Sequence, residues 1–368
     1  MKISLLATSL LFLCTTILGA EDPIARKARR IHDRIFTLDT HCDTPLLMLR
    51  SGWDPGQRHE PYGAKSGKQD FPRMKEAGLD ASFFAVFVPQ GDLTLEGRAR
   101  ARQQAERILD LLDVTFQKNS LLAQRALRPE EAYRLEKQGK RAIFLSLENG
   151  YPIGTDLSAV DYFYQRGIRT ITLAHSANND LCDSSTDSHR QADRGLSEFG
   201  RRVVARMNDL GMMIDVSHIS EKSFFDVLAA SRAPVMASHS SVRALCDHPR
   251  NLNDAQLDAL RKNRGVIQIC IFSRYVRSDP SPQAPANIAR AVDHIDYAVR
   301  RIGIDHVGIG TDFDGGGGLE DCRDVTDLPK ITEELVRRGY STDAIRKIWG
   351  ANAMRVMKES MRLARKGK

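Results

Sequence analysis

Residues of the kinds that bind metal ions recur in this chain where short apolar runs come to an end. The donors at these positions are His41, Asp43, Glu148, His218 and His239. Imidazole nitrogens and carboxylate oxygens together suit a divalent cation, zinc above all. Two further apolar runs end in His175 and in Asp312. The recurrence predicts a bound cation, because packing alone does not explain so many donors at the ends of successive strands.

Local spacing supports a shared site at the first of these runs. His41 and Asp43 are two residues apart, and side chains so spaced on an extended segment point the same way. Both can therefore reach one cation. Cys42 between them is an alternative candidate as a nucleophile, but its neighbours point away from its side chain and we disfavour it. Taken singly, each donor also fits an ordinary role as a turn or hydrogen-bonded residue, so the prediction rests on the set.

Five donors are more than one tetrahedral zinc ion with an open position uses. A carboxylate that bridges two cations resolves the count, and Glu148 is the best candidate because it can share its two oxygens. We then expect His41 and Asp43 on one ion, and His218 and His239 on the other. Zinc fits this mixed ligation best, with manganese or cobalt as alternatives. Two ions about 3.5–4 Å apart can hold a shared hydroxide that attacks a carbonyl or phosphoryl centre.

Eight short, mainly apolar runs alternate with helical patterns and predict a parallel sheet. They span residues 35–39, 81–88, 142–147, 169–174, 212–216, 234–237, 265–271 and 307–310. Eight parallel strands are the number that a closed (β/α)8 barrel of the TIM type needs, so we predict this α/β architecture. In such barrels the functional residues lie at the C-terminal ends of the strands, which is where the donors fall.

Helical patterns between the strands support the alternation. Apolar spacing within residues 199–210 predicts a helix with Ser197 as its N-cap and Gly211 as its stop. Another helix is predicted after Ser220, and a third over residues 288–302.

The N-terminus has the build of a secretory signal peptide. Lys2 precedes an apolar stretch over residues 3–18, and the small residues Gly19 and Ala20 stand just before charged ones. We predict cleavage near Ala20, a secreted or periplasmic protein, and no transmembrane span in the mature chain. The residue before Cys14 fits a lipoprotein cleavage site poorly, so lipid anchoring is disfavoured. The basic, polar C-terminus does not fit a hydrophobic anchor signal.

Residues 21–368 are predicted to form one catalytic barrel domain with C-terminal helices and a basic tail. Segments 51–70 and 278–286, rich in proline and other loop-forming residues, are predicted surface loops. The formal charge is +7, but the basic residues are scattered among 47 acids. Only residues 362–368 form a dense basic cluster, which we interpret as a solvated tail, and no nucleic-acid partner is predicted.

The cysteine content does not determine whether disulfides form or which cysteines they join. Five cysteines follow the signal segment, at Cys42, Cys182, Cys246, Cys270 and Cys322. Their odd number and wide spacing support neither a zinc ribbon nor a disulfide-dense scaffold. One or two bridges are compatible with the sequence, and their pairing cannot be derived from it.

Seven segments, in order along the chain, resemble the motifs of the membrane (renal) dipeptidases. They are residues 37–43 (TLDTHCD), 147–150 (LENG), 173–178 (LAHSAN), 215–218 (DVSH), 238–241 (SHSS), 248–251 (HPRN) and 308–315 (GIGTDFDG). The likeness runs from about Ile31 to about Val356. It implies an amidohydrolase-type barrel with a binuclear zinc centre that hydrolyses dipeptides. The implied metal ligands are His41, Asp43, Glu148, His218 and His239, with Glu148 as the bridge. The resemblance also implies substrate contacts by His175, Arg250 and Asp312, and a homodimer by analogy.

The residue types agree with these implied roles. Asp312 can take a proton from the nucleophile and pass it to the leaving amine. His175 can stabilise the developing oxyanion. Arg250 offers a planar fork for a terminal carboxylate, which would limit substrates to very short peptides.

We therefore predict a zinc-dependent dipeptidase in which a hydroxide that bridges two Zn²⁺ ions attacks the peptide bond. A different amidohydrolase activity, such as lactonase, deacetylase or phosphotriesterase, would share the metal centre. A non-enzymatic binding protein on an inherited barrel is the alternative from another class. No residue decides which dipeptides are cleaved, whether C-terminal D-residues or β-lactams are accepted, or which metal is native.

Overall fold

The computed structural model describes residues 22–63, 65–188, 192–277 and 285–365. The predicted signal peptide, residues 1–20, and most of the predicted loop 278–286 lie outside these ranges. Within the described chain no helix is both long and apolar enough to cross a membrane.

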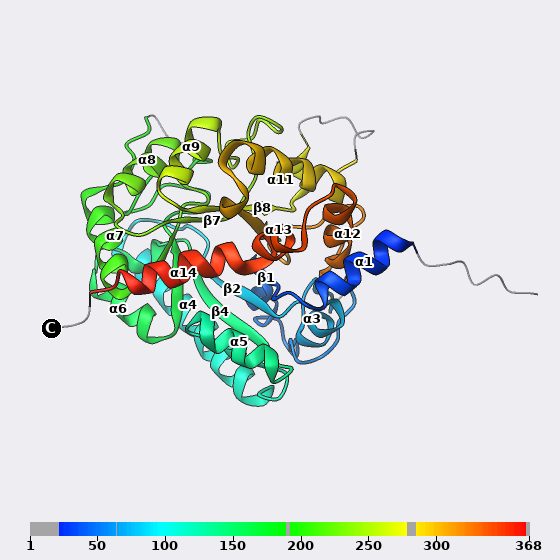
Figure 1. Cartoon of the computed structure of the whole chain (residues 1–368). Coiled ribbons are helices and arrows are strands. Elements are labelled where there is room, and N and C mark those ends of the chain that lie inside the picture. The colour runs from blue at the N-terminus through cyan, green and yellow to red at the C-terminus, as the bar shows by residue number, and fades with distance from the viewer. Residues whose placement is uncertain (1–21, 64, 189–191, 278–284, 366–368) are drawn as a thin grey trace, which may run out of the picture.

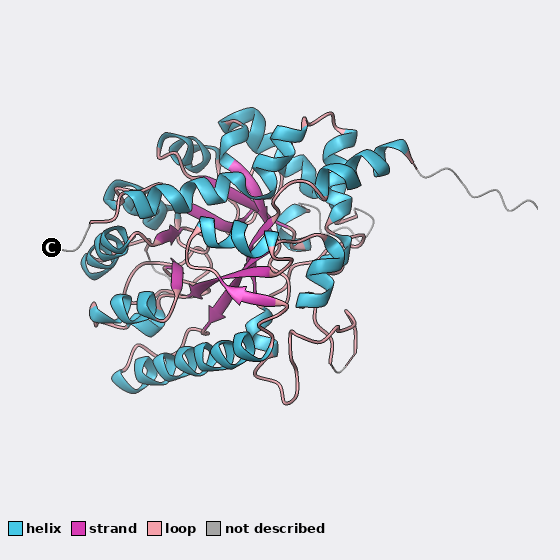
Figure 2. Ribbon diagram, turned by 60° about the horizontal axis from the view of Figure 1, so that its bottom comes forward, coloured by secondary structure: helices cyan, strands magenta, loops and turns pink. Residues whose placement is uncertain are grey.

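Parallel strands form a barrel that helices surround on the outside (Figures 1 and 2). The strands are β1 (Leu38–Cys42), β2 (Ala81–Phe87), β3 (Ala123–Arg125), β4 (Arg141–Glu148), β5 (Ile168–Thr172), β6 (Met213–Asp215), β7 (Met236–Ser240), β8 (Val266–Cys270) and β9 (Val307–Gly310). Eight of them pair in the order β1-β2-β4-β5-β6-β7-β8-β9. Cys42 also forms a parallel bridge with Phe313, just beyond β9, which nearly closes the ring. The predicted (β/α)8 architecture is confirmed.

The strand boundaries differ from the prediction in an informative way. β1 begins at Leu38 and runs through His41 and Cys42, whereas the apolar pattern placed the strand at residues 35–39. In the same way, Glu148 is the last residue of β4, and His239 lies inside β7. The polar residues at these strand ends are buried and still take part in the strand. A prediction from hydropathy therefore ends each strand too early. β3, which pairs with β4 outside the barrel order, was not predicted because Gln124 and Arg125 interrupt any apolar run.

The predicted helices are confirmed at their caps. Ser197 accepts a hydrogen bond from Gly200 N at the start of α7, and Gly211 ends that helix with a left-handed φ of 74°. Ser220 caps α8. The long helices are α1 (Pro23–His32), α3 (Phe71–Ala77), α4 (Leu95–Lys118), α5 (Pro129–Lys137), α6 (Ser158–Gln165), α7 (Glu198–Leu210), α8 (Glu221–Ala230), α9 (Asp254–Lys262), α11 (Ile288–Ile302), α12 (Pro329–Arg337) and α14 (Asn352–Arg362). Shorter helical segments are α2 (Thr44–Leu47), α10 (Ser273–Val276), α13 (Thr342–Arg346), Tyr151–Ile153, Ile304–His306, Val325–Asp327 and Lys347–Ala351.

Large apolar side chains fill the barrel near the beginnings of the strands. Phe83 of β2 stacks on Phe144 of β4 with ring centroids 4.9 Å apart. Met213, Met236 and Val266, the first residues of their strands, belong to the same buried cluster. Because the apolar residues occupy this end, the polar residues are gathered at the opposite, C-terminal ends of the strands.

The described residues of the predicted loop over residues 51–70 form no helix or strand, as expected, but they are fixed by internal contacts. The two ring nitrogens of His59 lie 2.8 and 3.0 Å from the carbonyl oxygens of Asp54 and Lys65. The backbone N–H of Lys68 donates to Asp314 Oδ1 at 2.7 Å. The loop is thereby tied to the segment that follows β9.

A buried histidine on α11 gives the fold an acid-sensitive contact. His294 Nδ1 accepts from Val242 N at 3.0 Å, so the neutral ring donates through Nε2 to Val276 O at 3.3 Å. Burial lowers the pKa of His294 to about 4. Between pH 6.5 and 4 the unfolded chain therefore binds more protons than the folded one. The free energy of unfolding falls as the pH falls through this window, by up to about 3 kcal/mol from this group.

We expect His294→Gln, which keeps an acceptor but cannot titrate, to flatten the decline in stability between pH 6.5 and 4. Urea unfolding of both proteins across that range measures the effect. Parallel pH profiles for the two proteins would contradict it.

Candidate metal-dependent active site

The structure brings the predicted metal donors together at the C-terminal end of the barrel. His41 lies in β1, Asp43 is the residue before α2, and Glu148 ends β4. His218 follows β6 by three residues, and His239 lies in β7. All five residues are at most 8% exposed.

Glu148 stands at the centre of these donors. Its Oε2 lies 3.3 Å from His41 Nε2, and His41 Nε2 is also 3.3 Å from Asp43 Oδ2. The other oxygen, Oε1, lies 3.3 Å from His218 Nε2 and 3.5 Å from His239 Nε2. The two oxygens of one carboxylate therefore face two different sets of donors.

Several of these donor atoms are buried without a hydrogen bond. His41 Nε2 and Asp43 Oδ1 make no hydrogen bond of good geometry to any described residue, although both are shielded from solvent and His41 Nε2 lies close to two carboxylates. Unsatisfied buried polar groups cost about 1–3 kcal/mol each, so they point to a further ligand. Imidazole nitrogens beside carboxylate oxygens fit a divalent transition-metal ion.

Among the residues that the structure describes, three overlapping clusters could hold a metal ion. They are His41, Asp43 and Glu148; Glu148, His175 and His218; and His41, His239 and Asp312. His175 and Asp312 thus lie within reach of the same centre as the donors. His175 Nε2 is 3.7 Å from Glu148 Oε1, and its ring stacks on that of His218 with centroids 4.1 Å apart.

Electrostatics keep two of the histidines neutral. Burial lowers the pKa of His218 and His239 well below their ordinary value, and the charge of Arg250 acts in the same direction. Neutral imidazole is the form that binds metals. Burial alone would also lower the pKa of His41, but the carboxylates of Glu148 and Asp43 outweigh it and raise that pKa well above its usual range. The two carboxylates therefore favour positive charge beside His41, and a bound metal cation would supply it in place of the proton.

Backbone strain is concentrated at the same strand ends. Asn149, His218, Asp312 and Asp314 adopt left-handed φ values of 76°, 70°, 59° and 65°. Such conformations cost non-glycine residues about 1–3 kcal/mol and persist where the surroundings impose them. At Asp312 the N–H donates to His41 O at 3.0 Å, which fixes the segment after β9 against β1.

A cavity of about 380 Å³ opens onto these groups. His175, His218, Arg250 and Asp312 line it, together with Asp43, Glu148 and the aromatic side chains of Phe87, Phe272 and Tyr275. Its size is at the lower end of the range for small-molecule sites.

Arg250 reaches this cavity from the loop after β7. It is 3% exposed, and its Nη2 donates to His239 O at 2.9 Å. The guanidinium carbon lies 5.4 Å from the centre of the Tyr275 ring. Arg250 Nε is buried without a partner, so this cation has unused donor capacity beside the cavity.

A model of the membrane dipeptidases, peptidase family M19, matches residues 25–368. The chain belongs to this family. The dipeptidase tcpJ of Claviceps purpurea is 35% identical over 87% of this chain and 76% of its own length. The dipeptidase verJ of Clonostachys rogersoniana is 31% identical over 90% of this chain and 86% of its own length. The family resemblance expected from the sequence motifs is confirmed, and the chain is a metallo-dipeptidase.

Solved structures agree with the sequence relatives. The probable dipeptidase PvdM from Pseudomonas aeruginosa superposes with a TM-score of 0.84 at 32% identity, covering 93% of this chain and 99% of that one. A metallo peptidase from Rhodobacter sphaeroides, liganded with a phosphinate mimic of the dipeptide L-Ala-D-Ala, superposes with a TM-score of 0.79 at 28% identity. The match covers 89% of this chain and 99% of that one.

Several residues at the dipeptidase site were not predicted from the sequence. Phe87 ends β2 beside Glu148, and its ring lies 4.6 Å from that of His175. An aromatic residue at the end of a predicted strand could have marked it. Phe272 and Tyr275 follow β8, and no local pattern distinguishes them from other aromatic residues.

Gly315 is another such position, because it leaves room for two carboxylates. A Cβ atom there would lie 2.1 Å from Asp43 Oδ2 and 2.6 Å from Asp312 Oδ1. We expect Gly315→Ala to displace both and to weaken metal binding by about 10–100-fold, as changes around metal ligands typically do. Competition with a chromogenic chelator measures this. Gly91→Ala is the control, because the atoms nearest to its added Cβ belong to the Tyr151 side chain, at 3.3 Å or more. Equal affinities in both variants would contradict the expectation.

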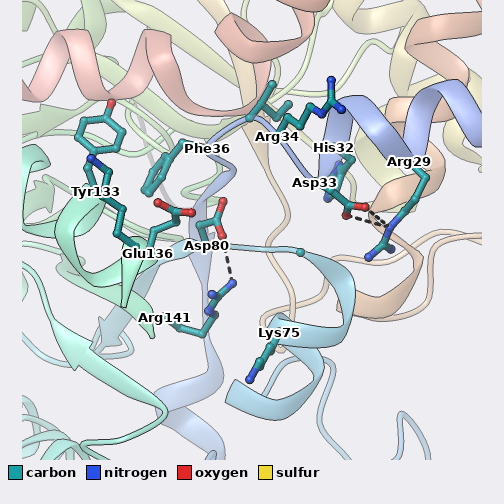
Figure 3. A pocket seen from close by; sticks show the side chains of 13 residues that line it. Arg29, His32, Asp33, Arg34, Phe36, Lys75, Asp80, Tyr133, Glu136 and Arg141 are labelled. Atoms are coloured by element: carbon teal, nitrogen blue, oxygen red, sulfur yellow. Dashed lines mark hydrogen bonds and ion pairs between the residues drawn. The ribbon is translucent and has the colours of Figure 1, made fainter. Parts of the chain in front are cut away.

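The dipeptidase barrel has a second hollow at the other end, of about 590 Å³ (Figure 3). It lies beside the beginnings of β2 and β4, where Arg141 pairs with Asp80 at 3.1 Å. Arg29 pairs with Asp33 at its rim. None of the metal-binding clusters found in the described chain falls here. Barrels of this type carry out chemistry at the C-terminal ends of the strands, so the smaller cavity is the active-site candidate.

Proposed function

We propose that this metallo-dipeptidase hydrolyses dipeptides at a pair of zinc ions that Glu148 bridges. The proposal rests on the way in which the donor residues are divided between the two carboxylate oxygens of Glu148. Oε2 faces His41, whose Nε2 is also close to Asp43, and Oε1 faces His218 and His239. One set of ligands for each ion, with a shared carboxylate, accounts for all five donors. When bound, such ions supply Lewis acidity and a hydroxide at near-neutral pH.

Arg250 is proposed to select the substrate by binding its terminal carboxylate. The guanidinium is held in place by His239 O, and its free donor capacity lies beside the cavity. A buried cation without a carboxylate partner is costly, so an anionic group of the substrate would stabilise it. A carboxylate clamp this close to the reacting centre leaves room for only one residue after the scissile bond.

Asp312 is proposed to move the proton during the reaction. Burial raises its pKa well above the ordinary range, and the nearby Asp43 carboxylate raises it further. A carboxyl group whose pKa is raised in this way binds a proton more readily and can pass it to the leaving amine. The side chain lies in one cluster with His41 and His239, within reach of the site of attack.

His175 is proposed to stabilise the oxyanion that forms on the scissile carbonyl. Burial lowers its pKa to about 4, with the charge of Arg250 acting in the same direction. The ring is therefore neutral and can donate one hydrogen bond without adding a charge to the site.

The localisation and domain organisation are also part of the proposal. The signal-peptide pattern of residues 1–20 supports secretion or export to a periplasm, and residues 21–368 would then form the mature single-domain enzyme. The L-Ala-D-Ala mimic bound to the Rhodobacter sphaeroides relative makes dipeptides with a C-terminal D-residue suitable substrates to test.

Hydrolysis of a dipeptide library, with and without chelator, tests the proposal. We expect cleavage of free dipeptides, loss of activity on metal removal and recovery with zinc. Tripeptides and dipeptide amides serve as controls for the carboxylate clamp, and lactones and phosphotriesters test the other amidohydrolase activities. Turnover of esters or phosphotriesters in preference to every dipeptide would overturn the proposed substrate class.

A further inference from the structure

A buried hydrogen-bonded chain connects His239 to a carboxylate that does not face the active-site cavity. Ser238 Oγ lies 2.8 Å from His239 Nδ1 and 2.5 Å from Asp215 Oδ2. Asp215 ends β6 and Ser238 lies in the neighbouring strand β7. Both residues are 1% exposed, so no water competes for these bonds.

The carboxylate of Asp215 is surrounded by donors. Its Oδ1 accepts from the backbone N–H groups of Ser217 and Ser238, each at 2.9 Å. Its Oδ2 accepts from Thr172 Oγ1 at 2.6 Å and from Ser238 Oγ. An ionised carboxylate can only accept, so it fixes the direction of every one of these bonds.

The direction of these bonds determines which nitrogen of His239 carries the proton. A serine hydroxyl has one hydrogen, and that of Ser238 is donated to Asp215. Ser238 Oγ must then accept from His239 Nδ1–H. A neutral ring protonated at Nδ1 has its lone pair at Nε2. This Nε2 lies 2.8 Å from His218 Nε2, from which it can accept a hydrogen bond, and 3.5 Å from Glu148 Oε1. The other two histidines of the predicted ligand set differ, because the Nδ1 atoms of His41 and His218 have no partner among the described residues.

We propose that Asp215 and Ser238 are positioning residues that hold His239 in the Nδ1–H tautomer before metal binds. They would thereby set the affinity for the ion that His218 and His239 share. This inference rests on the proposed function, because it takes His239 as a metal ligand. Substitution of a residue that hydrogen-bonds to a metal ligand typically changes metal affinity by about 10–100-fold.

Asp215→Asn should reverse the direction of the hydrogen bonds between residue 215, Ser238 and His239, with almost no change in the shape of the side chain. The two backbone N–H groups can only donate, so the amide oxygen takes the place of Oδ1 and the NH₂ group takes that of Oδ2. The NH₂ group then donates to Ser238 Oγ, which leaves the serine hydrogen to point at His239 Nδ1. His239 is driven to the Nε2–H tautomer, in which its lone pair no longer faces the metal site.

The tautomer can be observed directly in the metal-free full-length protein. With ¹⁵N-labelled histidine, two-bond ¹H–¹⁵N correlation spectra distinguish Nδ1–H from Nε2–H rings, and the signals of His239 are assigned by their loss in His239→Gln. We expect Nδ1–H in the unsubstituted protein and Nε2–H in Asp215→Asn. The Nε2–H form in the unsubstituted protein would overturn the inference.

Metal affinity provides the second measurement. Chelator competition with zinc should show one of two ions bound about 10–100-fold more weakly in Asp215→Asn, and the other unchanged. Thr172→Val is the matched control, because it removes an equally short bond to the same Oδ2 atom but leaves the Ser238–His239 bond intact. Equal losses in both variants would show a merely structural role and overturn the inference.

A second pair of variants tests the chain if Asp215→Asn does not fold. Ser238→Ala removes the acceptor for His239 Nδ1–H and should weaken the same ion, whereas Ser238→Thr keeps the hydroxyl and should restore the affinity. Failure of threonine to restore it, in a protein that melts like the parent, would overturn the inference. A parent protein that binds only one zinc ion would contradict the proposed two-ion site, while the tautomer measurement would still decide the role of Asp215 and Ser238.

Discussion

Asp312→Asn is expected to lower kcat for dipeptides by about 10²–10⁴-fold, the usual contribution of a positioned acid–base group. The asparagine keeps the shape of the side chain but can neither hold nor release the proton. Because this proton would move only as the bond breaks, kcat and kcat/KM should fall by similar factors. Steady-state kinetics on one dipeptide, with metal content measured on the same sample, checks the result.

The metal measurement separates two roles for Asp312, since its carboxylate lies in one cluster with His41 and His239. Retention of two ions together with a large loss in kcat supports proton transfer. Loss of an ion would instead make Asp312 a ligand. Asp314→Asn is the matched control, because that carboxylate accepts from Lys68 N and Thr44 Oγ1 and organises the loop. It should cost stability rather than two orders of magnitude in kcat.

Arg250→Met is expected to reduce kcat/KM for free dipeptides by about 10–150-fold, which corresponds to the 1.5–3 kcal/mol of a hydrogen bond to a charged group. The methionine retains much of the apolar stem beside Tyr275 but loses the guanidinium. The matching dipeptide amide has no terminal carboxylate, so its slower hydrolysis should change little. The ratio of the two specificity constants is the quantity to measure.

Two further variants define the origin of that effect. Arg250→Lys keeps a charge without the planar fork and should fall between the parent and Arg250→Met. Arg243→Met removes a neighbouring arginine that bonds to the carbonyls of Asn251 and Pro249 in the same loop. If Arg243→Met lowers dipeptide turnover as much as Arg250→Met does, loop integrity rather than carboxylate binding is responsible.

The sequence predicted the barrel because its strands are apolar runs separated by capped helices. Ser197 and Gly211 bound α7 as expected, and the eight strands of the barrel were all anticipated. The errors lie where polar residues are buried. β1 continues through His41 and Cys42 because the chain after β9 supplies hydrogen-bond partners: Asp312 N–H and the Thr311 hydroxyl both donate to His41 O. Hydropathy cannot anticipate a partner 270 residues away.

Some residues of the candidate site could also be predicted from local sequence patterns, and others could not. His41, Glu148, His218 and His239 could be predicted because each stands at or near the end of a run with a recognisable pattern. Arg250 lies in a loop that no periodicity marks, and its place was expected only from the family resemblance. The five cysteines are all buried and free, so the one or two disulfides that composition left open do not form in this structure.

Contacts between strands were beyond the reach of sequence patterns. Gly315 appears in the sequence as one of several loop glycines, and only the folded chain shows the carboxylates of Asp43 and Asp312 beside it. The link from Asp215 through Ser238 to His239 joins β6 to β7. Its existence depends on the register of two strands, which a single sequence does not specify.

Titration of the metal-stripped protein with zinc, followed by dipeptide hydrolysis at each step, tests the two-ion dipeptidase most directly. We expect negligible hydrolysis without metal and full activity only near two equivalents per chain. Glu148→Gln, which weakens the shared ligand, should fail to reach that activity at any zinc concentration that keeps the protein soluble. Full dipeptide hydrolysis by the stripped protein, or saturation of activity at one equivalent, would contradict the bridged pair of ions.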